Sequence, residues 1–176
     1  RNCGIFRNMT NDNLETDIEL ENTLISAPFA GRQAVFARIQ QYLIDPSDRH
    51  ALLVMGRKSI GKSAMLVRCQ QVLGEHVIGC YLPLNDDVVA DETTWLKYLY
   101  HHTNFSVQQH QLNIERLPDL PDDPTQYRDW FSDEYLFELR KLIRPHRRWI
   151  WLIDDIEYLI KALDNKQLPA DSLDYL

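Results

Sequence analysis

The chain has 176 residues, of which 44% are hydrophobic and 26% charged, and its net charge is −7. These values are typical of one globular domain, and the acidic balance disfavours a dedicated nucleic-acid binder, so nucleic acid is not indicated as a partner. No apolar run approaches the roughly 18 residues of a transmembrane helix, so no membrane partner is expected. Three widely spaced cysteines, Cys3, Cys69 and Cys80, indicate reduced thiols and a cytoplasmic protein.

The N-terminal part of the sequence divides into a polar arm and the start of a domain. Residues 1–27 are rich in Asn and Glu and only weakly periodic, whereas residues 28–176 carry the elements of a folded domain. From residue 33 onward, Val35, Phe36 and Ile39 follow helical spacing, and Asp45-Pro46 ends that pattern. We therefore expect a helix over residues 33–43.

Three short apolar runs predict strands that are buried on both faces. They are "ALLVM" at 51–55, "VIGCYL" at 77–82 and "WIWLI" at 149–153. Helical patterns separate the strands or follow the last one, and they cover residues 62–73, 95–99, 130–143 and 158–163, while a loop rich in Pro and Asp spans residues 113–128. This alternation predicts an α/β fold with a parallel β-sheet flanked by helices.

The stretch "GRKSIGKSA" joins the first predicted strand to the helix that follows it. It satisfies the pattern G-x-x-x-x-G-K-[ST], in which backbone N–H groups cradle phosphates and the helix N-terminus adds its positive dipole end. The Lys62 ammonium would reach the β- and γ-phosphates and act in catalysis, and the Ser63 hydroxyl would hold Mg²⁺. The expected nucleotide-binding residues of this loop are Gly56, Arg57, Lys58, Ser59, Ile60, Gly61, Lys62, Ser63 and Ala64.

An acid at the end of a hydrophobic strand is the second Mg²⁺ anchor that such a loop requires. Asp154 follows the apolar run at 149–153, so we expect it to hold Mg²⁺ together with Ser63. The alternative for Asp154 is a helix N-cap. Asp155 is the candidate that polarises the attacking water, and its short side chain favours slow hydrolysis or none.

Three motifs in this order resemble the AAA+ and STAND ATPases. They are "APFAGRQAVFARIQQYL" at 27–43, "GRKSIGKSAML" at 56–66 and "WIWLIDDIE" at 149–157. The "GRxxIGKS" phrase is most similar to the archaeal and bacterial STAND-like branch. The resemblance implies a P-loop NTPase fold and places Phe29, Gly31 and Arg32 near the adenine. The sequence departs from the family pattern at Gln33 and Asp155, where glutamate is usual.

The same resemblance implies a sheet order of 5-1-4-3-2, and no fourth strand is readable after Asp154. The sequence therefore looks truncated after its Walker B motif, the aspartate segment at 149–157. We expect the domain to be incomplete at its C-terminus, to belong to a longer polypeptide and to lack hydrolytic competence alone, because a missing central strand would leave open sheet edges.

The function expected from these motifs is an ATP-binding, Mg²⁺-dependent ATPase module that acts as a nucleotide-controlled switch or assembly domain. Its expected partners are ATP or ADP, other domains of the same polypeptide and a second copy of itself. The alternative is a nucleotide-binding scaffold with little or no hydrolysis that recruits partners. A small-molecule kinase is a weaker alternative.

Three further features have simpler interpretations. A GTPase would need Asn-Lys-x-Asp, but "DNKQL" has Leu168 at the last position, which favours adenine. His101, His102 and His110 lack acid or Cys partners at ligand spacing and are interpreted as a solvated helix end rather than a metal site. The basic "RPHRRW" at 144–149 is interpreted as a helix C-terminus with favourable cations, with an arginine finger or a nucleic-acid contact as its alternatives.

Overall fold

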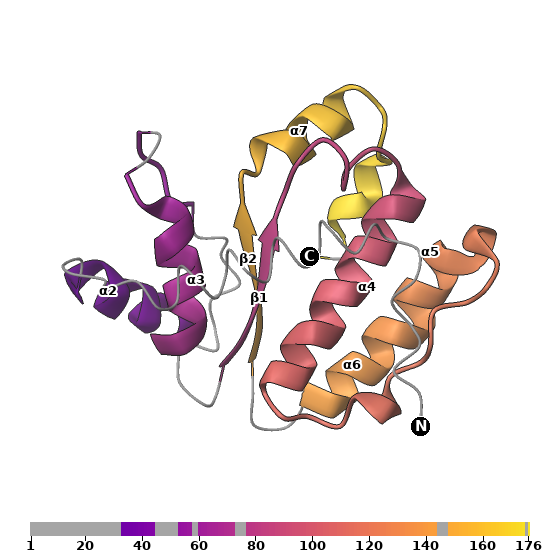
Figure 1. The fold of residues 1–176 in the computed structure, drawn as a ribbon, viewed down its shortest axis with the longest axis horizontal. Helices are drawn as coiled ribbons and strands as arrows, with labels where there is room; N and C mark the ends of the chain where they lie inside the picture. The colour runs from indigo at the N-terminus through magenta and orange to yellow at the C-terminus, as the bar shows by residue number, and fades with distance from the viewer. Residues whose placement is uncertain (1–32, 45–52, 58–59, 73–76, 144–147, 175) are drawn as a thin grey trace. The chain divides into compact units, whose positions relative to one another are not determined.

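The computed structural model describes residues 33–44, 53–57, 60–72, 77–143, 148–174 and 176 (Figure 1). The chain forms two compact units, Arg1–Val72 and Leu73–Leu176, and each is described by itself. The predicted arm at 1–27 and its boundary with the following domain lie outside the described residues, as does most of the basic cluster at 144–149.

The described part of the first unit contains two helices, α2 (Gln33–Ile44) and α3 (Lys62–Val72), and both confirm helices predicted from periodicity. Ile39 of α2 is buried, but Val35 is 41% exposed although the pattern placed it on the apolar face. In α3, Met65, Val67 and Cys69 are buried, and burial raises the pKa of the Cys69 thiol to about 11. Within the described residues, neither Cys69 nor Cys80 is in a disulfide, and Cys3 lies outside those residues.

The second unit is built on two parallel strands, β1 (Val77–Pro83) and β2 (Arg148–Asp154). Their register pairs Val77 with Arg148 at one end and Pro83 with Asp154 at the other. Both strands were predicted as continuous apolar runs. Residues 77–82 are fully buried, which is the environment that such a run indicates.

The predicted three-stranded sheet is wrong for the part of the chain that the structure describes. That part contains a two-stranded sheet, and residues 53–55 of the first predicted strand are not in a strand, while residues 51–52 lie outside the described residues. Leu53 is 67% and Met55 81% exposed, so this apolar run is not the buried strand that we expected. The chain is α/β only in a loose sense, and the P-loop NTPase fold is not shown.

Helix α4 (Glu92–Gln109) lies alongside β1 and supplies much of the core of the second unit (Figure 1). It begins at a capped end, because the Asp91 carboxylate accepts a hydrogen bond from the Thr94 N–H at 2.8 Å. Trp95, Leu96 and Leu99 are almost completely buried. The helix confirms the apolar pattern that predicted it.

The segment after α4 is irregular until residue 127, which agrees with the predicted loop. It holds two short 3-10 turns, η1 (Ile114–Arg116) and η2 (Pro124–Gln126), before α5 (Tyr127–Asp129). The predicted helix at 130–143 is present in two parts, a π-helical turn η3 (Trp130–Tyr135) and α6 (Leu136–Ile143). The wider π turn buries Trp130, Phe131 and Tyr135 while residues 132–134 remain exposed.

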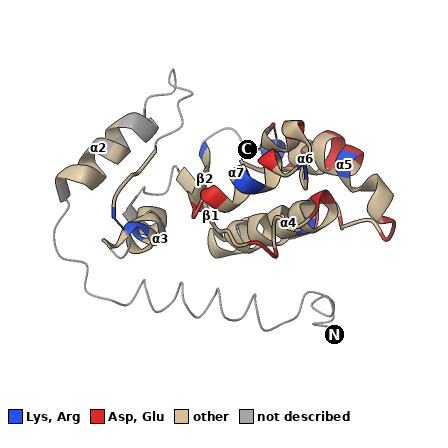
Figure 2. Cartoon of the chain, turned by 90° about the horizontal axis from the view of Figure 1, so that it is seen from above, with Lys and Arg blue, Asp and Glu red and all other residues tan. Residues whose placement is uncertain are grey.

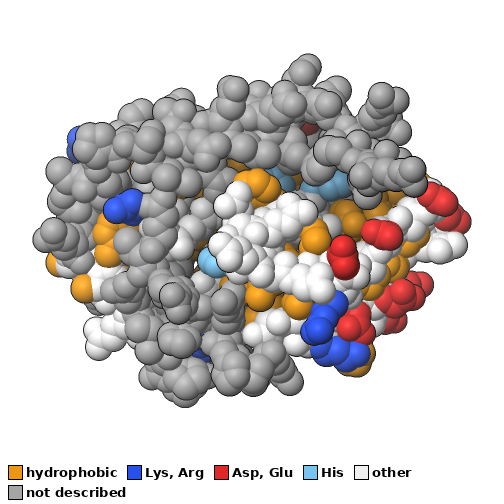
Figure 3. Space-filling view, turned by 60° about the horizontal axis from the view of Figure 1, so that its bottom comes forward, with side chains coloured by type: hydrophobic (Ala, Val, Ile, Leu, Met, Phe, Trp, Pro, Cys, Tyr) orange, Lys and Arg blue, Asp and Glu red, His pale blue; other side chains and the backbone are white. Residues whose placement is uncertain are grey.

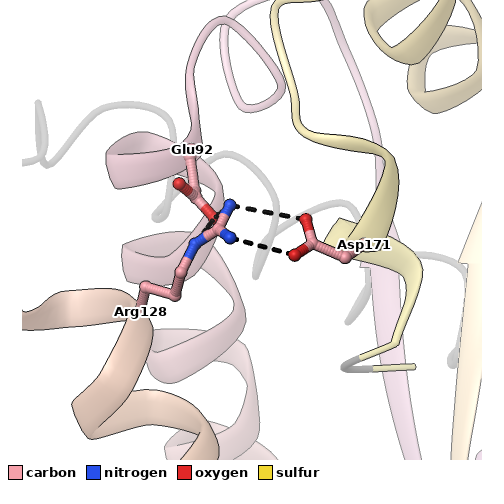
Figure 4. Close-up of polar contacts among 3 residues, drawn as sticks. All are labelled: Glu92, Arg128 and Asp171. Atoms are coloured by element: carbon pink, nitrogen blue, oxygen red, sulfur yellow. Dashed lines mark hydrogen bonds and ion pairs between the residues drawn. The ribbon is translucent and has the colours of Figure 1, made fainter.

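The C-terminal segment consists of α7 (Glu157–Asp164) and a 3-10 turn, η4 (Ala170–Leu173). The Arg128 guanidinium joins this turn to α4, because it contacts Glu92 at 2.6 Å and Asp171 at 2.9 Å (Figure 4). These side chains are partly exposed, so each pair contributes at most about 1 kcal/mol. The arrangement nevertheless connects three segments that are distant in the sequence.

Charged and apolar side chains share the described surface. Both α5 and α6 carry acidic and basic side chains (Figure 2). Acidic side chains gather toward one edge of the face drawn in Figure 3, beside exposed apolar ones. Phe137 and Ile160 are about half exposed, at 53% and 52%. Among the described residues, no helix has both the length and the apolarity needed to cross a bilayer.

His102 is buried in α4, so its interpretation as part of a solvated helix end is wrong. Its Nδ1 lies 3.1 Å from the Tyr81 carbonyl oxygen, and its ring lies 4.2 Å from that of Tyr98. Burial lowers the pKa of His102 from 6.5 to about 4. The imidazole is therefore neutral at pH 7, and its Nδ1–H donates to the Tyr81 carbonyl.

We expect the free energy of unfolding to fall as the pH drops from about 6.5 toward 4. The unfolded chain protonates this histidine near pH 6.5 and the folded chain only near pH 4, so the unfolded state binds more protons between these values. The loss attributable to His102 is roughly 3 kcal/mol. His102→Asn keeps an N–H donor without titrating, and urea unfolding across this range should show a shallower slope. An unchanged slope would contradict the assignment.

Candidate nucleotide and magnesium site

The predicted phosphate loop ends at a glycine with a left-handed backbone. Gly61 has φ +86, a conformation that L side chains rarely adopt, and no atom lies within 4 Å of the position that a Cβ would occupy. Glycine is therefore needed here for backbone conformation and not for space. The Gly61 carbonyl accepts the Met65 N–H at 3.1 Å, which makes Gly61 the residue that opens α3.

The Lys62 side chain turns back over its own loop. Its Nζ donates to the carbonyl oxygens of Gly56 at 3.2 Å and Arg57 at 3.4 Å. A Cβ on Gly56 would lie 3.1 Å from the Ile60 side chain, so the loop closes tightly at this glycine. The Lys62 ammonium and the first turn of α3 thus belong to one compact turn.

The other predicted residues of this loop divide into two groups. Arg57 and Ile60 are exposed, whereas Ser63 and Ala64 in the first turn of α3 are half-buried. The remaining predicted nucleotide-binding residues lie outside the described residues, namely Phe29, Gly31, Arg32, Lys58 and Ser59.

Asp154 lies at the carboxyl end of β2 and is only 5% exposed. Its Oδ2 accepts a hydrogen bond from the Tyr81 hydroxyl at 3.0 Å, and its Oδ1 accepts one from the Asp155 N–H at 3.1 Å. Its backbone carbonyl accepts the Leu84 N–H at 3.2 Å. Asp154 does not cap the next helix, because the N-cap position of α7 is Ile156.

Asp155 differs from its neighbour in both exposure and backbone conformation. Its side chain is exposed, and its φ of +52 is uncommon for a residue other than glycine. The turn directs the two adjacent acids into different environments, one buried and one facing solvent.

The two halves of the predicted magnesium site belong to different units. Residues 56–64 lie in the first unit, and Asp154 and Asp155 lie in the second. In the described residues, no cluster of three or more His, Cys, Asp or Glu side chains is arranged to hold a metal.

Sequence reasoning missed Tyr81, which contacts Asp154 directly. A hydroxyl inside the otherwise apolar run "VIGCYL" was the available signal, because a buried Tyr O–H almost always has a hydrogen-bond partner. Identifying that partner required the register of β1 on β2.

No protein-family model, no curated protein and no solved structure matches this chain.

Gly61→Ala should lower the free energy of unfolding of the first unit by about 1–2 kcal/mol, because alanine is strained at positive φ. Gly61→Asn is the matched control, since asparagine tolerates left-handed backbone better than alanine does, and it should cost less. Urea titration of the three proteins measures the order. An alanine variant as stable as wild type would contradict the conformation of this turn.

Proposed function

We propose that the chain binds ATP with Mg²⁺ through the loop at residues 56–64 and acts as a nucleotide-controlled switch or assembly module. The observation that carries the proposal is the Lys62 ammonium held over the tight turn between Gly56 and the N-terminus of α3. Its present acceptors are neutral carbonyl oxygens. Phosphate oxygens are anionic and form stronger charge-assisted hydrogen bonds, so a bound triphosphate would replace these carbonyl oxygens as acceptors of the Lys62 ammonium.

The metal part of the proposal rests on the chemistry of the donor atoms. The Ser63 hydroxyl and the Asp154 carboxylate are hard oxygen ligands of the kind that Mg²⁺ prefers. When bound, the ion would neutralise charge on the phosphates. The resemblance to AAA+ and STAND ATPases belongs to this proposal, as do adenine preference, contacts near Phe29, Gly31 and Arg32, and a cytoplasmic location.

Hydrolysis is proposed to be slow. Asp155 is the candidate that orients water, but it is exposed and one methylene shorter than the glutamate usual at this position. These features also favour a second function, a nucleotide-binding scaffold that recruits other domains or a second copy. Steady-state phosphate release separates the two, because the scaffold releases none above background.

Lys62→Ala should weaken ATP binding by about 10- to 100-fold, since charge-assisted bonds to phosphate contribute roughly 1.5–3 kcal/mol. Isothermal titration calorimetry measures the affinity. Lys141→Ala is the control, because that exposed lysine pairs with Glu138 on α6 and should not affect the nucleotide. Equal affinity in wild type and Lys62→Ala would remove Lys62 from the site.

Asp154→Asn should retain most of the metal-free ATP affinity but lose the gain that Mg²⁺ provides, because an amide is a poorer ligand than a carboxylate for a hard cation. The measurement is ATP affinity in excess EDTA and in excess Mg²⁺. If Mg²⁺ strengthens binding equally in the variant and wild type, Asp154 does not serve the metal.

A further inference from the structure

We draw no further inference here: the strongest candidate, the apolar surface patch that Ile156 and Ile160 form along α7 of the second unit at 37% and 52% exposure, carries none, because nothing in the structure shows what covers it.

Discussion

A buried carboxylate must be hydrogen-bonded, and this requirement organises the end of the two-stranded sheet. Asp154 is almost completely removed from solvent, and its two oxygens are bound by donors from β1 and from the following turn. Those donors are in place only because the strands are parallel and in the observed register. Helix α4 supports the same strand end through His102 and Tyr98, so packing, pairing and polar contacts all converge on one side chain.

The sequence pattern predicted the helices and two strands because each pattern reports directly on local burial. The same reasoning failed at residues 53–55, because an apolar run indicates where burial would be favourable but not whether a neighbouring strand is present to pair with it. Leu53 and Met55 are exposed, and the described sheet has two strands. The π-helical turn at 130–135 likewise depends on how three aromatic rings pack, which helical periodicity does not encode.

In the candidate site, features that depend on neighbouring residues could be predicted from the sequence, and contacts between distant segments could not. The turn at Gly61 and the position of Lys62 follow from a short motif whose parts are neighbours in sequence. The Tyr81–Asp154 contact depends on strand register and could not be predicted from either segment alone. His102 was predictable in part, because positions 95, 99, 102 and 106 follow helical spacing and all four are buried. The interpretation as a solvated helix end was wrong because it treated His102 together with its neighbour His101 and considered only the lack of acid or Cys partners at ligand spacing.

The distance along the chain between Tyr81 and Asp154 has a kinetic consequence. Their 73-residue separation means that the chain must close a long loop before this contact can form, whereas the turns of α4 need only neighbouring residues. Contacts between distant segments slow folding, and parallel strands always require such a closure. The Asp154 environment should therefore be among the last parts of the second unit to assemble. During synthesis, α4 can form on the ribosome well before the acid that it helps to hold has been translated.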